Sequence, residues 1–316
     1  MYDTVRFYHR DYRIDFNALI QNLTKCETKM NSKTGEVLYH EGYINNFFVR
    51  IGIGWIYCDC SFPRLIYSDN SFTLKRTDAK NCIEFLSDNL HYDMNNASVT
   101  RIDVATTFSM EQPVRMYLDC LGDLSSFKRL KVVNNETLEY RKGDSNNGQS
   151  LVFYDKRLES LEKRKIHPKG LSGDNLLRYE HRWHGRLATR LKESEVIGST
   201  LHDERFYQKI VGLWGEDYFK IEKKRSVSMR AIMQSGKMSN NEILNIIFAY
   251  CSSKLPHEDF YNFVNHLIDS LGLSANEKYR LMKKIKETLS NPAITEDVSL
   301  IKELDAKIRE VTNNLQ

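Results

Sequence analysis

The chain has 316 residues, of which 41% are hydrophobic and 28% are charged, with only five prolines. This composition excludes fibrous, collagen-like and wholly disordered proteins, and the length predicts two domains. The formal net charge of +4 does not by itself indicate nucleic-acid binding.

The sequence has no segment typical of a signal peptide or a membrane span. The first fifteen residues carry Asp3, Arg6, Arg10, Asp11, Arg13 and Asp15. The longest apolar runs, 47–60 and 243–251, are interrupted by Arg50 and by glycines or are too short to cross a bilayer. We therefore expect a cytoplasmic protein that does not contact membranes.

The first two thirds of the chain mix predicted strands with predicted helices. Five runs dense in β-branched and aromatic residues predict strands at 3–10, 43–60, 98–108, 149–156 and 176–183. Apolar residues at helical spacing predict helices at 73–90 and 111–121. This order predicts an α+β domain over residues 1–230, in which an antiparallel sheet is flanked by helices.

The last third of the chain predicts helices alone. Capping boxes at Ser239 and Ser274 each precede a predicted helix, and an apolar stripe over 260–271 stops at Gly272. Another stripe covers 296–311. We expect an independently packed helical domain over 239–316, so that a chain ending near residue 237 would still fold.

A group of basic residues on the predicted helix after Ser274 is a candidate contact for DNA phosphates. The alternative is a solvated helix face. The group consists of Lys278, Arg280, Lys283, Lys284 and Lys286.

The six cysteines contain no CxxC pair, and thiols of large cytosolic proteins stay reduced. We therefore interpret all six as core residues. Cys58 and Cys60 share a strand face, but two ligands without further Cys or His nearby make a poor zinc site. The six are Cys26, Cys58, Cys60, Cys82, Cys120 and Cys251.

Two predicted strands place charged side chains on one face. Alternation puts Arg101, Asp103 and Ala105 together in the first strand. In the second strand it groups Arg178, Glu180, Arg182 and His184. If the strands are neighbours, Asp103 and Glu180 could converge on a hard divalent cation. The alternative is a set of arginine–carboxylate pairs on a solvated sheet face.

The run 149–165 begins with the alternation of a strand and ends with the spacing of a helix. Tyr154 and Lys156 lie at this junction, which is a suitable place for a reactive side chain. A tyrosine hydroxyl is a weak nucleophile unless a cation or base assists it. The alternative is a packed tyrosine whose hydroxyl is hydrogen-bonded.

The region 151–192 is strongly basic. It holds eleven Lys or Arg against five Asp or Glu, a surplus of six positive charges. Basic side chains interleaved with Tyr154, Tyr179 and Trp183 are typical of a groove that follows a phosphate backbone and stacks unpaired bases.

Three segments, taken in this order, resemble the rolling-circle replication initiators of filamentous phages (the gene II protein family) and, more distantly, staphylococcal plasmid initiators. They are SVTRIDVATTFS at 98–109, GQSLVFYDKRLE at 148–159 and NLLRYEHRWHGRLATRL at 175–191. The resemblance implies an enzyme that nicks and rejoins one DNA strand at an origin. The reaction leaves a 5′-phosphotyrosine and a 3′-hydroxyl primer.

The resemblance also implies roles for particular residues. The nucleophile falls on Tyr154, with Lys156 as a second catalytic residue. Mg²⁺ or Mn²⁺ would be held by Asp103, Glu180, Glu159 and His184. A histidine–hydrophobe–histidine pair is missing from the sequence, so this site would be rich in carboxylates. Contacts to DNA fall on Arg101, Arg178, Arg182, Arg157, Lys163, Arg164 and Lys165.

The expected partners are single-stranded and origin DNA, with a host helicase and polymerase. Two alternatives remain open. One is a mobilisation relaxase with the same chemistry, and the other is a non-catalytic DNA-binding protein.

Overall fold

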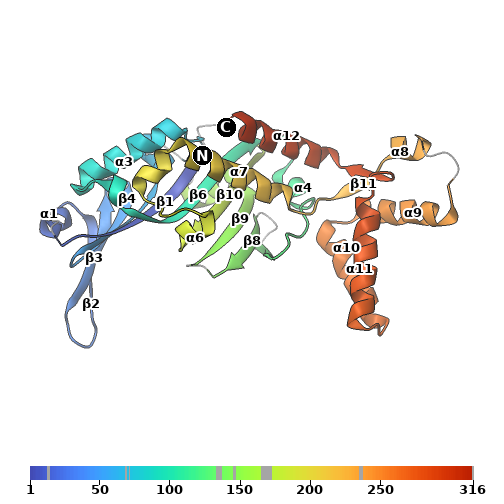
Figure 1. Ribbon diagram of the computed structural model, residues 1–316, viewed down its shortest axis with the longest axis horizontal. Coiled ribbons are helices and arrows are strands. Elements are labelled where there is room, and N and C mark those ends of the chain that lie inside the picture. The colour runs from blue at the N-terminus through green and yellow to red at the C-terminus, as the bar shows by residue number, and fades with distance from the viewer. Residues whose placement is uncertain are drawn as a thin grey trace.

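The computed structural model describes residues 1–12, 15–67, 70, 72–132, 137–144, 147–164, 173–234 and 238–314. Within these residues the chain forms a ten-stranded antiparallel sheet, with helices against one face and a helical arm at one end (Figure 1). The strand order is β2-β3-β4-β5-β1-β6-β10-β9-β8-β7. The predicted α+β class with an antiparallel sheet is confirmed.

The strands of the large sheet are β1 (Tyr2–Arg10), β2 (Thr24–Met30), β3 (Val37–Ile44), β4 (Phe47–Gly52), β5 (Trp55–Ser61), β6 (Ser98–Ser109), β7 (Lys128–Val132), β8 (Thr137–Gly143), β9 (Gly148–Asp155) and β10 (Leu176–His184). A second sheet pairs β11 (Arg225–Val227) with β12 (Thr295–Asp297). The helices are α1 (Phe16–Gln21), α2 (Phe62–Ile66), α3 (Arg76–Leu90), α4 (Val114–Leu118), α5 (Lys156–Arg164), α6 (Leu187–Leu191), α7 (Glu204–Phe219), α8 (Met229–Gln234), α9 (Asn240–Lys254), α10 (His257–Ser270), α11 (Ala275–Ser290) and α12 (Ser299–Asn314). The 3₁₀ helices among the described residues are η1 (Met94–Asn96) and η3 (Gly198–His202).

The sheet has more strands than the five that the sequence predicts. The run 43–60 is not one strand, because it turns back on itself at 45–46 and at 53–54. Asn45 and Gly54 have φ values of +51° and +73°, the backbone conformation that two-residue hairpin turns require. The strands β2, β7 and β8 escape prediction because their sequences are rich in charged residues.

The predicted helix 73–90 is confirmed as α3, which begins at Arg76. The prediction for 111–121 is wrong in extent, because only the short helix α4 forms there and Met116 is exposed. No helix in the described part of the chain is long and apolar enough to span a membrane.

The main core lies between the sheet and α3, α7 and α12, which cover one face (Figure 1). Ile102 and Val104 of β6 and Tyr179 of β10 point to this side and are buried. The ring of Tyr179 stacks on that of Trp214 of α7, with centroids 4.7 Å apart. The apolar face of the central strands is therefore fully used for packing, which leaves the charged face for other tasks.

Four of the six cysteines are core residues, as predicted: Cys58, Cys60, Cys82 and Cys120. The prediction is wrong for Cys26 on β2 and Cys251 on α9, which are exposed. Both lie on elements whose faces are largely solvated, so a core position is not available to them.

The helices after residue 239 do not form one unit. The helices α9, α10 and α11 share a small core around Phe260, Val264 and Ile268 and project as an arm (Figure 1). The last helix, α12, returns to the sheet domain, where Ile301 and Leu304 are completely buried in the main core. The predicted domain boundary at 239–316 is therefore wrong for α12. A chain ending near residue 237 would lack the part of the main core that α12 supplies.

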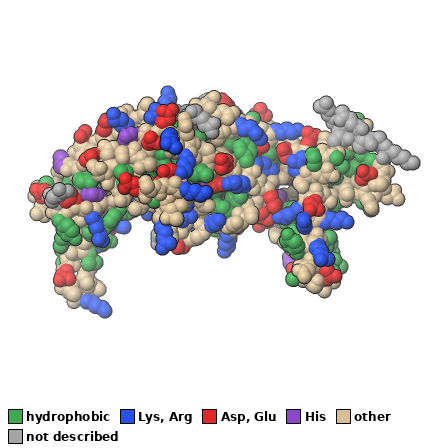
Figure 2. Space-filling model, in the orientation of Figure 1, with side chains coloured by type: hydrophobic (Ala, Val, Ile, Leu, Met, Phe, Trp, Pro, Cys, Tyr) green, Lys and Arg blue, Asp and Glu red, His purple; other side chains and the backbone are tan. Residues whose placement is uncertain are grey.

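The arm is tied to the sheet domain by polar contacts. Arg129 of β7 binds Glu258 of α10 at 2.8 Å, and Lys286 of α11 binds Glu222 at 2.7 Å. Figure 2 shows basic side chains beside acidic ones where the arm meets the sheet domain. The junction is therefore held by ion pairs more than by a shared apolar core.

The predicted ends of the arm helices are confirmed. Both capping boxes are present, at the starts of α9 and α11. Gly272, with φ +64°, follows α10 as expected.

Candidate active site on the polar face of the sheet

The charged residues that the sequence places on one strand face meet on neighbouring strands. In the register of β6 and β10, Asp103 lies opposite Arg182 and Arg101 lies opposite His184. On the other side of β10, Tyr154 of β9 lies opposite Arg178. Because directly opposite residues share a face, the three predicted segments form one polar surface on the side away from the main core.

Tyr154 is hydrogen-bonded within this surface. Its hydroxyl donates to Oε1 of Glu180 at 2.6 Å, and its side chain is largely buried. The strand β9 ends one residue later and α5 begins at Lys156, so Tyr154 occupies the predicted strand-to-helix junction.

Arg178 is a buried member of the cluster and binds several of its residues. Its guanidinium donates to Oε1 of Glu180 at 2.8 Å and pairs with Asp3 of β1 at 3.0 Å. It also donates to the carbonyl oxygen of Asn70 and to the hydroxyl of Thr107. Its side chain is only 2% exposed, so the expected contact between Arg178 and a DNA phosphate does not fit this arrangement.

A second arginine–carboxylate group lies beside the first. Arg101 donates to both carboxylate oxygens of Asp103, and Arg182 binds Glu180 at 2.5 Å while approaching Asp103 to 4.0 Å. The arginine pairs that the sequence left open as an alternative are thus present. Arg101 and Arg182 are the accessible members, with side-chain exposures of 19% and 30%.

These contacts set the protonation states of the site. Burial and the Glu180 carboxylate hold the pKa of Tyr154 well above its usual value. Burial alone would raise the pKa of Glu180, but Arg182 and Arg178 outweigh it and hold that pKa far below its usual range. At neutral pH the proton therefore stays on Tyr154, and Glu180 is an anion held by two cations.

Lys156 is the second candidate catalytic residue. Its ammonium group lies 5.9 Å from the centre of the Tyr154 ring and forms an ion pair of 2.7 Å with Glu159. Burial, followed by the charge of Arg178, lowers the pKa of Lys156. Lys156 and Glu159 therefore flank the tyrosine from α5.

The other predicted residues lie farther from Tyr154. His184 faces the arginines, and burial together with Arg101, Arg6 and Arg182 lowers its pKa to about 4. Arg157 on α5 pairs with Asp174 at 3.5 Å. The side chains of Lys163 and Arg164, and the whole of Lys165, lie outside the described residues.

Two small cavities open on the polar face on either side of Arg182. One, of about 270 Å³, is lined by Tyr154 and by the acidic residues Glu139, Asp155, Glu159 and Glu162. The other, of about 200 Å³, is lined by Arg101, Arg141, Arg182 and His184 together with the acidic Glu139 and Asp144. The first therefore has a mainly acidic lining and the second a mainly basic one.

Several residues of this polar surface were not predicted from the sequence. Asp3 binds Arg178, and Glu139 and Arg141 of β8 pair with each other at 2.8 Å beside Ser150 of β9. The alternation of Leu138 and Tyr140, both buried, with these charged residues was the available signal.

The carboxylates of Asp103 and Glu180 are not free to bind a metal ion in this arrangement. The carboxylate of Asp103 is engaged by Arg101, and that of Glu180 by Arg178, Arg182 and Tyr154. Among the described residues no group of three or more His, Cys, Asp or Glu side chains is close enough to hold an ion.

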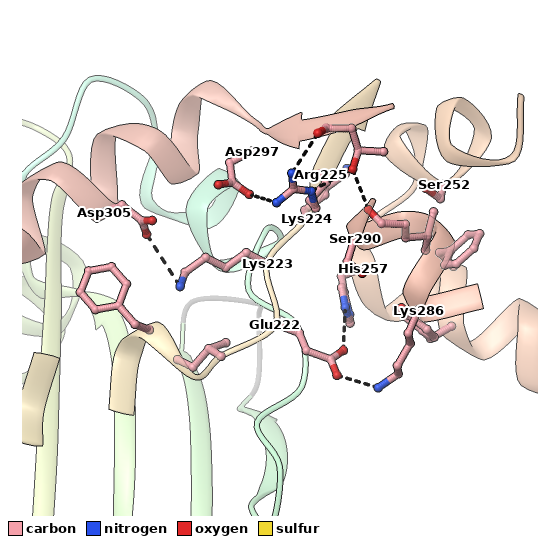
Figure 3. Close-up of a pocket in the computed structure, with 16 residues that line it drawn as sticks. Glu222, Lys223, Lys224, Arg225, Ser252, His257, Lys286, Ser290, Asp297 and Asp305 are labelled. Carbon is pink, nitrogen blue, oxygen red and sulfur yellow. Dashed lines mark hydrogen bonds and ion pairs between the residues drawn. The ribbon is translucent and has the colours of Figure 1, made fainter. Parts of the chain in front are cut away.

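A cavity of about 470 Å³ lies away from this face, between the arm and the sheet domain (Figure 3). Glu222 points to Lys286 and His257 there, Lys223 to Asp305, and Arg225 to Asp297 (Figure 3). Its charged side chains are largely paired with one another, and we interpret the cavity as part of the junction between the arm and the sheet domain.

Comparisons with known proteins point to replication. Residues 56–207, which contain Asp103, Tyr154 and Glu180, match a family model that describes the N-terminal region of the gene II type of replication-associated protein. A solved structure of a rolling-circle replication initiator protein from Geobacillus stearothermophilus is similar with a TM-score of 0.37 and 14% identity, over 67% of this chain and 83% of that chain. A search of curated proteins gave no match. Residues 56–207 are therefore similar to the N-terminal region of the gene II type of replication-associated protein, the family that the sequence motifs resemble.

Proposed function

We propose that the protein initiates rolling-circle replication by nicking and rejoining one strand of origin DNA, with Tyr154 as the nucleophile. The observation that carries the proposal is the 2.6 Å hydrogen bond between Tyr154 and Glu180 inside a cluster of arginines. Glu180 offers the tyrosine a proton acceptor, and Arg178 and Arg182, which bind the same carboxylate, place positive charge nearby. The match of this region to a replication-associated family supplies the substrate class.

The chemistry needs a proton acceptor and a stabilised phosphate. The Tyr154 oxygen attacks phosphorus, its proton passes to Glu180, and the bond from phosphorus to the 3′ oxygen breaks. That oxygen takes up a proton and becomes the free 3′-hydroxyl. Because the number of phosphodiester bonds is unchanged, the reverse reaction can rejoin the strand.

The arginines connect substrate binding to activation of the nucleophile. With Arg178 and Arg182 both bound to Glu180, the carboxylate is a weak base. A DNA phosphate competes for the accessible guanidinium of Arg182, and bidentate arginine–phosphate pairs are favourable. Losing one cationic partner raises the basicity of Glu180, so Tyr154 is activated when the phosphate arrives.

The residues on α5 assist this step. The Lys156 ammonium stabilises the negative charge that develops near the tyrosine, and Glu159 orients it through their ion pair of 2.7 Å. Arg101 and Arg182 line the cavity of about 200 Å³ in which an adjacent phosphate is bound.

The divalent ion expected from the sequence stays a prediction. An ion would have to displace arginines from Asp103 and Glu180, or bind the acidic cavity beside Tyr154. Calorimetric titration with Mn²⁺, in the presence of single-stranded DNA, tests this. Equal heats for wild type, Asp103→Asn and Glu180→Gln would contradict a site made by these two carboxylates.

The nucleophile is tested by denaturing electrophoresis after incubation with single-stranded DNA and Mn²⁺. Tyr154→Phe removes one oxygen and should bind DNA yet form no denaturation-resistant adduct. Tyr279→Phe on α11, where the ring is 70% exposed and lies away from the sheet, is the matched control and should form the adduct normally. DNA binding by all variants without any adduct would favour the non-catalytic alternative.

A further inference from the structure

A second surface on the same face of the sheet carries aromatic rings beside arginines. It is formed by alternating residues of β3, β4, β5 and β1 that share one face of the sheet in the strand register. Its rings are Tyr8, Tyr39, Tyr43, Phe48, Trp55 and Tyr57, and its arginines are Arg6, Arg10 and Arg50. We propose that this aromatic platform binds the unpaired bases of a DNA strand that runs to Tyr154. The inference rests on the proposed function and names the part of the substrate bound beyond the site of cleavage.

The rings lie next to one another across four strands. Tyr8 stacks on Trp55 with centroids 6.1 Å apart, and Tyr39 meets the same indole edge-on at 5.9 Å. Phe48 contacts Tyr43 at 5.5 Å and Tyr57 at 6.5 Å. Five of the rings are half-buried and Tyr43 is 42% exposed, so part of each side chain remains accessible to solvent.

Arg50 lies at the centre of the platform. Its guanidinium is 5.2 to 5.5 Å from the rings of Phe48, Tyr57 and Tyr39, and its side chain is 40% exposed. Arg6 lies over Tyr57, and Arg10 over Tyr8. Arginines held on aromatic faces present both a stacking plane and a positive charge, which matches the alternation of bases and phosphates in a single strand.

The backbone makes room for the largest ring. A Cβ atom on Gly52 would lie 2.3 Å from the Trp55 ring, so the indole lies directly against the glycine. This close approach fixes the indole across the strand rather than letting it extend into solvent.

The helices near these strands pack on the opposite side. Leu19 of α1 and Phe62 of α2 belong to the main core, and the ring of Phe62 stacks on that of Phe7 of β1. Within the described residues, the contacts of these helices therefore lie on the core face, and the platform faces away from them. In Figure 1 the hairpin of β2 and β3 extends beyond this part of the sheet.

The platform is continuous with the candidate active site. Arg6 of β1 pairs with Asp59 of β5 at 2.8 Å and lies opposite Arg101 of β6. Arg101 in turn binds Asp103. From β9 to β5 the sheet has four strand spacings, or about 19 Å at roughly 4.8 Å each. A single strand can therefore follow the face from Tyr154 past Arg182 and Arg101 to the rings.

Single-stranded DNA fits this surface better than a duplex does. Stacking requires bases whose faces are free, and it tolerates any sequence because every base has an aromatic face. A duplex offers only its phosphates, which the few arginines between the rings would bind weakly.

Trp55 provides a direct signal for the test. The protein has three tryptophans, and Trp183 and Trp214 are only 2% and 0% exposed. Titration with a labelled oligo-dT strand should therefore quench the fluorescence of Trp55 alone, while the anisotropy of the label reports the affinity. The same oligonucleotide annealed to oligo-dA should leave the fluorescence unchanged.

Variants separate stacking from folding. Trp55→Ala should weaken binding of the oligo-dT strand roughly tenfold, and Trp55→Phe should restore most of the affinity. Gly52→Ala keeps every ring but displaces the indole, so it should weaken binding and reduce the quenching. Tyr279→Ala on α11 is the matched control, because this ring is 70% exposed and lies outside the platform.

The outcomes distinguish the inference from the proposed function. Trp55→Ala should still form the covalent adduct with saturating DNA, because the cleavage residues are untouched. Platform-dependent binding without any adduct in wild type would overturn the nicking function and leave the platform in place. Unchanged affinity in Trp55→Ala, or equal quenching by duplex, would overturn the platform.

Discussion

The hydroxyl of Tyr154 and the carboxylate of Glu180 are 2.6 Å apart on adjacent strands, and two arginines bind the same carboxylate. This relationship fixes the resting state of the site. The tyrosine keeps its proton, and the carboxylate cannot accept it until a cationic partner is withdrawn. Glu180 should therefore contribute to the stability of the fold as well as to the proposed chemistry.

Glu180→Gln should destabilise the protein by about 3–5 kcal/mol, because it leaves the buried Arg178 and the partly exposed Arg182 beside a neutral side chain. Urea unfolding at neutral pH measures the loss. Glu139→Gln is the matched control on the same face, since its partner Arg141 is 47% exposed, and it should cost only about 0–1 kcal/mol. Equal effects of the two substitutions would contradict the central role of Glu180 in the cluster.

Asp103 should make stability fall as the pH rises from about 4 to 6. Burial raises the pKa of Asp103 to about 6, against the opposing charges of Arg101 and Arg182. In the unfolded chain the pKa is about 3.9, so the folded state binds the proton more tightly. The contribution is complete below the unfolded pKa and is lost as the pH passes the folded value.

The measurement is the stability of wild type and Asp103→Asn in urea across this range. The wild type should lose stability relative to the variant between about pH 4 and pH 6, because the asparagine cannot titrate. A constant difference over the range would show that Asp103 does not titrate there.

Leu304→Ala should destabilise the whole sheet domain, although it lies near the end of the chain. Leu304 is completely buried in the main core, and large-to-small changes at such positions cost about 2–5 kcal/mol. Lys302→Ala on the same helix is the control, because its ion pair with Glu296 is exposed. If the free energy of unfolding in urea is the same for Leu304→Ala as for the control, α12 does not belong to the main core.

Arg280 and Lys284 of α11 should contribute to duplex binding. Both side chains are exposed, whereas Lys278 is paired with Asp269 and Lys286 with Glu222. Replacing both Arg280 and Lys284 with Ala should lower the slope of log affinity against log salt by about 2, one for each lost phosphate contact. Lys278→Ala serves as the control. An unchanged salt dependence of the affinity in the double variant would show that Arg280 and Lys284 do not contact DNA and are only solvated.

The sequence predicted which charged residues share a sheet face better than it predicted the fold around them. Alternation in β6 and β10 placed Asp103, Glu180 and Arg182 on one face correctly, because a two-residue period depends only on the strand itself. Strand pairing, by contrast, is a non-local property. The contact between Asp3 and Arg178 joins β1 to β10 across β6, and no local pattern indicates it.

The domain boundary failed for a similar reason. The stripe on α12 correctly predicted a helix, but an amphipathic stripe does not indicate which surface will cover it. The aromatic platform was missed because its residues come from four strands, two of which were hidden in the single run 43–60. The turn at Asn45 sets Tyr43 opposite Phe48, and the turn at Gly54 sets Arg50 opposite Tyr57.

The central claim is tested most directly by locating the covalent bond. The protein is incubated with a pool of random-sequence single-stranded oligonucleotides and Mn²⁺, the adduct is digested, and the peptide that carries the nucleotide is identified by mass spectrometry. The proposed chemistry predicts a phosphodiester link to the Tyr154 hydroxyl, in the peptide that contains LVFYDK. A nucleotide attached to Tyr140, Tyr179 or any other residue would contradict it.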